Sequence, residues 1–148
     1  ALNPEKIIFG FDSFEGLPET WDRADSEVPQ GTFAMRNDQL PIVLHNVRLV
    51  KGLFKNTLPK FKQTTLKNAP IAFLHIDVDI YSSTKDVLDN LQDHIVPGTI
   101  IVFDEFYNYE GYDRNEFKAF HEFLKKCKRK ANYIAYNQYF EQVAIRIE

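Results

Sequence analysis

The sequence predicts an α/β fold, in which helices flank a mostly parallel sheet that ends in an antiparallel hairpin. Short apolar runs such as residues 71–76 (IAFLHI) alternate with segments whose apolar residues recur at helical spacing. The last two runs instead alternate apolar and polar residues around a polar turn, as hairpins do. No repeat or low-complexity tract interrupts this order, so we expect residues 1–148 to form a single domain.

Composition narrows the class of protein. The chain has 148 residues, of which 44% are hydrophobic, and its 18 basic and 21 acidic side chains give a net charge of −3. A chain of this length buries roughly 70% of its unfolded surface, enough for a core of its own. The acidic balance argues against a nucleic-acid partner, and no apolar run is long enough to cross a membrane. With the single cysteine Cys127 and no signal-peptide pattern, we expect a cytoplasmic protein.

The first half of the chain contains two predicted strands separated by a long loop. Residues 6–11 (KIIFGF) form the first strand, and residues 47–50 form the second. The polar loop between them, residues 12–46, contains several glycines and prolines and is expected to form one or two short helical turns. Loops of this length usually serve a function.

A helix and a buried strand are expected next. The helix lies within residues 52–67, with Asn56 or Thr57 as its N-cap and Pro59 in its first turn. Residues 71–76 form a continuous apolar run, which is typical of a strand buried on both faces. His75, within this run, is therefore expected to be a core residue.

The rest of the chain continues the alternation. Ser83, followed three residues later by Asp86, forms a capping-box pattern that predicts the start of a helix. A second buried strand is expected at residues 99–103 (TIIVF), followed by a helix that begins near Asp113 and Glu116. The closing hairpin is expected to pair residues 132–136 with residues 142–147, around a turn at Asn137-Gln138.

Acidic side chains follow both predicted buried strands. Asp77 and Asp79 come directly after one strand, and Asp104 and Glu105 come after the next. One helix lies between these strands, so both acid pairs are expected at the carboxyl ends of a β-α-β unit, where open α/β sheets bind ligands. Converging carboxylates repel one another, and a hard divalent cation removes that repulsion. The alternative is that these acids cap helices or face water.

Three stretches resemble the macrocin O-methyltransferase (TylF-like) family: residues 11–19 (FDSFEGLPE), 75–84 (HIDVDIYSST) and 103–112 (FDEFYNYEGY). Members of this family are metal-dependent class I S-adenosylmethionine methyltransferases that act on sugar hydroxyls of natural products. The resemblance extends from about Lys6 to the last predicted helix. It implies a Rossmann-like, doubly wound sheet and an enzyme that methylates a hydroxyl of a small molecule.

The resemblance also implies roles for individual residues. Asp77, Asp104 and Glu105 would bind Mg²⁺ or another hard divalent cation, and Asp79 would act as the general base on a small-molecule hydroxyl acceptor. Many relatives have a second aspartate at the position of Glu105, where glutamate still supplies oxygen ligands on a longer side chain. The residues that the resemblance places around S-adenosylmethionine are Asp12 (on the ribose), Ser13, Phe14, Gly52, Phe54 and Asp77.

One feature of the family is missing from this sequence. The family's first strand ends in a glycine-rich turn beside the cofactor, but no GxGxG pattern occurs in the chain. The strand at residues 6–11 therefore corresponds to the family's second strand. The family places its first strand between residues 6–11 and residues 71–76, so two strand edges would be exposed here. We expect the 148 residues to be an N-terminally truncated piece of such a domain.

Other functions also remain compatible with the sequence. A methyltransferase-like fold that has lost cofactor binding could serve as a non-catalytic binding or assembly module. The same acids could support a metal-dependent phosphoester hydrolase. Aromatic residues beside the second acid pair could line an acceptor or simply pack in the core: Tyr107, Tyr109 and Tyr112. A homo-oligomer is also compatible with the sequence.

Overall fold

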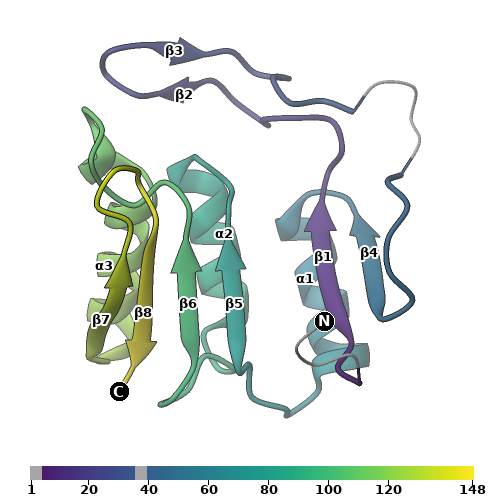
Figure 1. Ribbon diagram of the computed structural model, residues 1–148. Coiled ribbons are helices and arrows are strands. Elements are labelled where there is room, and N and C mark those ends of the chain that lie inside the picture. The colour runs from purple at the N-terminus through teal and green to yellow at the C-terminus, as the bar shows by residue number, and fades with distance from the viewer. Residues whose placement is uncertain (1–4, 36–39) are drawn as a thin grey trace.

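The computed structural model describes residues 5–35 and 40–148, and it has the expected α/β class (Figure 1). Residues 36–39, which belong to the predicted long loop, lie outside the described residues. The strands stand side by side, and the helices α1, α2 and α3 lie behind them (Figure 1). A long connection crosses above the carboxyl ends of the strands and contains β2 and β3 (Figure 1).

The main sheet has four strands in the order β5–β6–β8–β7. Strands β5 (Phe73–Ile76) and β6 (Ile100–Phe103) run parallel, as the predicted β-α-β unit requires. Strand β8 (Val143–Ile147) is antiparallel to both β6 and β7 (Ala131–Tyr136). The predicted antiparallel hairpin at the end of the chain is therefore confirmed.

Strands β1 (Ile8–Asp12) and β4 (Val47–Lys51) form a separate, two-stranded parallel sheet. Figure 1 shows β1 beside β5 with both strands pointing the same way, yet the described residues form no pairing between them. Both strands also carry exposed apolar side chains, Ile8 by 55% and Phe73 by 61%. The sheet is thus interrupted where the family resemblance places the missing strand.

Strand β5 is not buried on both faces, so that prediction is wrong. Ile76 is buried in the core and Leu74 packs against it, whereas Phe73 and His75 are exposed. The reason is that the described helices cover only one face of the sheet (Figure 1). His75 is accordingly not a core histidine: its side chain is 49% exposed, and Nε2 lies 3.9 Å from Oδ1 of Asp104.

The helices are α1 (Phe54–Phe61), α2 (Tyr81–Leu91) and α3 (Glu116–Cys127). Helix α1 continues into a π-helical turn, η2 (Lys62–Leu66), and a 3₁₀ turn, η3 (Tyr112–Arg114), precedes α3. Their apolar faces meet the sheet in one core that includes Leu58, Leu88, Ile101, Phe103 and Phe120. None of the helices in the described residues has the length and apolar composition that a membrane crossing requires.

The start of α1 differs from the prediction. The helix begins at Phe54 with Leu53 at the N-cap, so neither Asn56 nor Thr57 caps it, and Pro59 lies inside the helix. The chain turns directly from β4 into the helix, which places Thr57 in the first turn. There the Thr57 hydroxyl donates a hydrogen bond to the Leu53 carbonyl at 3.1 Å.

The start of α2 also differs, because a tight backbone turn sets it instead of a cap side chain. The Ile80 N–H donates to the Val78 carbonyl at 2.6 Å, and the helix begins at Tyr81. Ser83 is therefore a buried residue inside the first helical turn, and the capping-box prediction is wrong.

The long loop forms a short hairpin, and the predicted helical turns do not occur in its described part. Strands β2 (Trp21–Asp22) and β3 (Glu27–Val28) pair antiparallel. Trp21 packs in a second small core with Leu17, Ile80 and Tyr109. Tyr109 is only 8% exposed, so this tyrosine packs in a core. These apolar contacts hold the loop against the carboxyl ends of the strands, which explains why it does not form helical turns of its own.

Candidate active site

The carboxyl ends of the strands surround a cavity of about 600 Å³. The loops after β1, β4, β5 and β6 each contribute to its wall. Among the residues predicted from the sequence, seven line the cavity: Asp12, Ser13, Gly52, Phe54, Asp77, Asp79 and Glu105. Phe14 and Asp104 are not among the lining residues.

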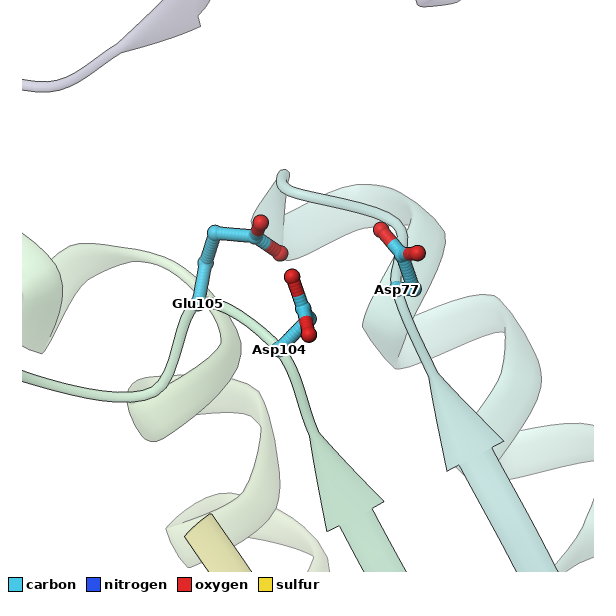
Figure 2. Close-up of side chains that lie close together, drawn as sticks. All are labelled: Asp77, Asp104 and Glu105. Carbon is cyan, nitrogen blue, oxygen red and sulfur yellow. The ribbon is translucent and has the colours of Figure 1, made fainter. Parts of the chain in front are cut away.

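Three carboxylates converge at the ends of β5 and β6. Figure 2 shows Asp77 after β5, with Asp104 and Glu105 after β6, their side chains turned toward one another. One carboxylate oxygen from each of these residues lies within 4.8 Å of the other two. The parallel register, which places Ile76 opposite Phe103, brings both strand ends to the same level. The convergence expected from the sequence is therefore present.

Burial and mutual repulsion raise the pKa values of this group. Burial is the main cause of the raised pKa of Asp77, and the Asp104 carboxylate adds to it. Burial, with the charge of Asp77 second, raises the pKa of Asp79 to about 6. The pKa of Glu105 is also raised, first by burial and then by Glu116. Each shift has the sign expected where negative charges gather in a partly buried site, and a proton or a cation would relieve the repulsion.

The donor set fits a hard divalent cation. Oε2 of Glu105 is buried and has no hydrogen-bond partner in the described part of the chain. Such an oxygen costs free energy unless something binds it. All the donors in the group are carboxylate oxygens, which suit Mg²⁺, Mn²⁺ or Ca²⁺ rather than a metal that prefers sulfur or nitrogen. Asp77, Asp104 and Glu105 could together hold such an ion.

Asp79 lies outside this group of three, although it lines the same cavity. Its backbone has a φ of 63°, in the left-handed region that aspartate tolerates better than most residues. This conformation belongs to the tight turn between β5 and α2, and it leaves the half-buried Asp79 side chain at the cavity wall. A carboxylate there could accept a proton from a bound molecule.

The opposite part of the cavity is formed by the ends of β1 and β4. Oδ1 of Asp12 accepts the Phe14 N–H at 2.7 Å, which closes a turn at the end of β1. Gly52 has a φ of 133°, and a Cβ at this position would lie 3.0 Å from Cγ2 of Thr57. Glycine at this position allows the chain to turn from β4 into α1 beside the cavity, whereas any other residue would strain the backbone.

Sequence reasoning missed one buried acid at the site. Glu116, the first residue of α3, has 0% exposure. Its Oε1 accepts the Val78 N–H at 3.4 Å, and its Oε2 accepts the Glu105 N–H at 3.2 Å. Burial raises its pKa well above the ordinary value. In the sequence Glu116 looks like an ordinary acidic residue at a helix start, and no local signal distinguishes it.

The comparisons with known proteins define the class of protein. A family model described as macrocin-O-methyltransferase (TylF) matches residues 3–136. The chain belongs to this family, which confirms the resemblance seen in the three motifs.

Two curated relatives come from Streptomyces. The 8-demethyl-8-(2,3-dimethoxy-alpha-L-rhamnosyl)-tetracenomycin-C 4'-O-methyltransferase of Streptomyces olivaceus is 31% identical, over 64% of this chain and 40% of its own length. The demethyldecarbamoylnovobiocin O-methyltransferase of Streptomyces niveus is 28% identical, over 69% of this chain and 42% of its own length. The chain thus spans about two fifths of the length of these relatives.

Solved structures show the same fold. CalS11, a calicheamicin methyltransferase, is similar with a TM-score of 0.72 and 24% identity, over 97% of this chain and 61% of its own. The O-methyltransferase NovP is similar with a TM-score of 0.65 and 22% identity, over 96% of this chain and 60% of its own. These likenesses confirm the predicted Rossmann-like methyltransferase fold.

Proposed function

We propose that the protein is an O-methyltransferase that uses S-adenosylmethionine and a hard divalent cation such as Mg²⁺. Its acceptor would be a hydroxyl of a sugar or another small natural product. The observation that carries this proposal is the convergence of Asp77, Asp104 and Glu105, of which Asp77 and Glu105 line a cavity large enough for small molecules. Support also comes from the curated relatives, both of which are named as O-methyltransferases.

In this proposal the ends of β1 and β4 bind the methyl donor. The Asp12 carboxylate accepts hydrogen bonds from the ribose hydroxyls, while Ser13, Gly52 and Phe54 enclose the rest of the nucleoside; the family resemblance also places Phe14 and Asp77 around the donor. S-Adenosylmethionine supplies a methyl group on a positively charged sulfur, which keeps the bonding electron pair and leaves as a thioether when the carbon–oxygen bond forms. The protein contributes mainly alignment of the reacting atoms.

Asp79 takes the proton that the acceptor hydroxyl releases. It lines the same cavity, and its pKa of about 6 makes it a stronger base than an ordinary aspartate. Asp77, Asp104 and Glu105 would hold the cation, whose positive charge stabilises negative charge on an acceptor oxygen. The roles are thus divided: three carboxylates bind the ion, and one accepts the proton.

We also propose that the domain continues beyond these 148 residues and that a further parallel strand fits between β1 and β5. The unpaired edges of both strands support this proposal. Amide hydrogen exchange in the full-length protein tests it. The outward-facing amides of β1 and β5 should be protected there, and rapid exchange at both edges would contradict the proposal.

The test of the function separates binding from chemistry in the full-length protein. Asp77→Asn and Asp104→Asn should abolish Mg²⁺ binding in calorimetry, with the fold retained. Asp79→Asn should keep the affinities for Mg²⁺ and S-adenosylhomocysteine but lower turnover roughly 10²–10⁴-fold. The matched control, Asp93→Asn, removes an exposed acid in the turn that follows α2 and should change none of these quantities.

Each other outcome has a distinct meaning. Near-normal turnover in Asp79→Asn, with the ion bound, would show that Asp79 is not the base. Loss of Mg²⁺ binding in that variant would make Asp79 a ligand instead. A parent protein that binds no S-adenosylhomocysteine would favour a non-catalytic binding module.

A further inference from the structure

Glu116 connects the two loops that carry the candidate site. Its carboxylate accepts two backbone N–H groups, and each belongs to the residue that directly follows a candidate metal ligand. Val78, which donates to Oε1, follows Asp77 at the end of β5. Glu105, which donates to Oε2, follows Asp104 at the end of β6. One side chain therefore bridges both strand ends through their main chains.

The structure holds this carboxylate firmly. Glu116 is fully buried at the start of α3, and the same helix is anchored in the core by Phe120 and Phe123. The preceding residue, Asn115, is also buried and donates through Nδ2 to the Asp22 carbonyl at 3.2 Å. The acceptor oxygens are thus fixed relative to the sheet.

The two N–H groups, both partly buried, favour this arrangement. A buried N–H without an acceptor costs free energy, so the loops favour conformations in which both groups reach Glu116. Moving either loop away from the other would break one of the two hydrogen bonds. The length of one glutamate side chain therefore limits how far apart the two loops can lie.

We propose that Glu116 is a positioning residue. By accepting both N–H groups, it sets the separation of the loops after β5 and β6, and it thereby fixes the mutual placement of the site carboxylates: Asp77, Asp79, Asp104 and Glu105. Glu116 neither belongs to the group of three converging carboxylates nor lines the cavity. It acts on the site through backbone, and its effect on cation affinity rests on the proposed function.

Two substitutions separate the length of the side chain from its pair of acceptor oxygens. Glu116→Asp keeps the carboxylate but withdraws it by one methylene, so it cannot span both amides. Glu116→Gln keeps the length but has one acceptor oxygen, so its amide nitrogen would face one N–H. The matched control is Glu122→Asp, which shortens an exposed glutamate on the same helix.

Amide hydrogen exchange in the full-length protein is the first measurement, because it needs no metal. In Glu116→Asp the Val78 and Glu105 amides should exchange at least about tenfold faster, while the core amides of β6 and α3 keep their rates. Glu122→Asp should leave both site amides unchanged. Unchanged exchange at Val78 and Glu105 in Glu116→Asp and Glu116→Gln would overturn the proposal.

Calorimetric Mg²⁺ titration is the second measurement. Both Glu116 variants should bind Mg²⁺ roughly 10–100-fold more weakly than the parent, which is the usual effect of losing a residue that orients metal ligands. Unchanged affinity in Glu116→Asp would overturn the positioning role. If the parent itself binds no Mg²⁺, the cation in the proposed function is wrong, and the exchange rates alone decide whether Glu116 positions the loops.

Discussion

Arg23 in the β2–β3 hairpin forms a two-pronged ion pair with Glu141, in the loop between β7 and β8. Nη2 of Arg23 lies 2.6 Å from Oε1 of Glu141, and Nη1 lies 3.4 Å from Oε2. The same guanidinium lies 4.6 Å from the ring centre of Trp21 and 4.4 Å from that of Tyr109. The β2–β3 hairpin is thus attached to the β7–β8 loop, at the end of the main sheet opposite β5.

This contact should contribute to stability. Removing the side chain in Arg23→Ala should lower the free energy of unfolding by about 1.5–3 kcal/mol, because the pair is mostly buried and charge-assisted. Urea unfolding measures the change, and proteolysis within residues 21–28 should accelerate. The exposed pair between Arg114 and Asp22 is the control: Arg114→Ala should cost only about 0–1 kcal/mol. Equal effects of both variants would contradict this ranking.

Asp12→Asn should weaken binding of S-adenosylhomocysteine to the full-length protein. The asparagine can still accept the Phe14 N–H, so the turn after β1 is retained. It lacks the charge, and charge-assisted hydrogen bonds to a ligand contribute about 1.5–3 kcal/mol. Calorimetry gives the affinity, with the exposed Asp25→Asn as control. Equal affinity of the parent and Asp12→Asn for S-adenosylhomocysteine would show that Asp12 does not bind the cofactor.

The ionisation of Asp79 should respond to both pH and Mg²⁺. Its pKa is raised from 3.8 to about 6, so the folded protein holds the proton more tightly than the unfolded chain does. Asp79 therefore contributes stability below pH 3.8, and that contribution is lost as the pH rises through about 6. Adding Mg²⁺ should lower the pKa, since a nearby cation favours the carboxylate. Carbon-13 NMR of the carboxyl carbon measures both values, and a pKa that does not move with Mg²⁺ would argue against a nearby ion.

Gly52→Ala should destabilise the chain where β4 turns into α1. The φ of 133° is unfavourable for alanine, and the new Cβ would also crowd Thr57. We expect a loss of about 1–3 kcal/mol in the free energy of unfolding. Gly98→Ala separates the two causes, because Gly98 also has a positive φ but nothing lies within 4 Å of the added carbon. If Gly52→Ala lowers the free energy of unfolding no more than Gly98→Ala does, the contact with Thr57 contributes nothing to the loss.

Much of the fold and the carboxylate group could be predicted from the sequence because both depend on short-range patterns. The apolar runs at residues 71–76 and 99–103 identify β5 and β6, and the acids that follow these strands must lie at their carboxyl ends. Parallel pairing then brings Asp77 and Asp104 together. The roles of these residues stay predictions until binding and turnover are measured.

The features that could not be predicted depend on distant parts of the chain. Glu116 contacts an amide 38 positions away, which no local pattern indicates. Ser83 is a good cap residue, but the backbone turn before Tyr81 decides where α2 begins. The exposure of Phe73 depends on what covers the sheet, and an apolar run alone does not indicate whether both faces have neighbours.

The divided sheet has a consequence for how the protein loses its structure. Asp12 and Gly52 belong to the β1–β4 part of the cavity wall, whereas Asp77 and Asp79 belong to the part that follows β5. A small molecule that spans the cavity touches both parts, so its binding free energy also opposes their separation. A saturating ligand would therefore add to the contacts of the shared core that already join the two parts, and it would raise the temperature at which they unfold.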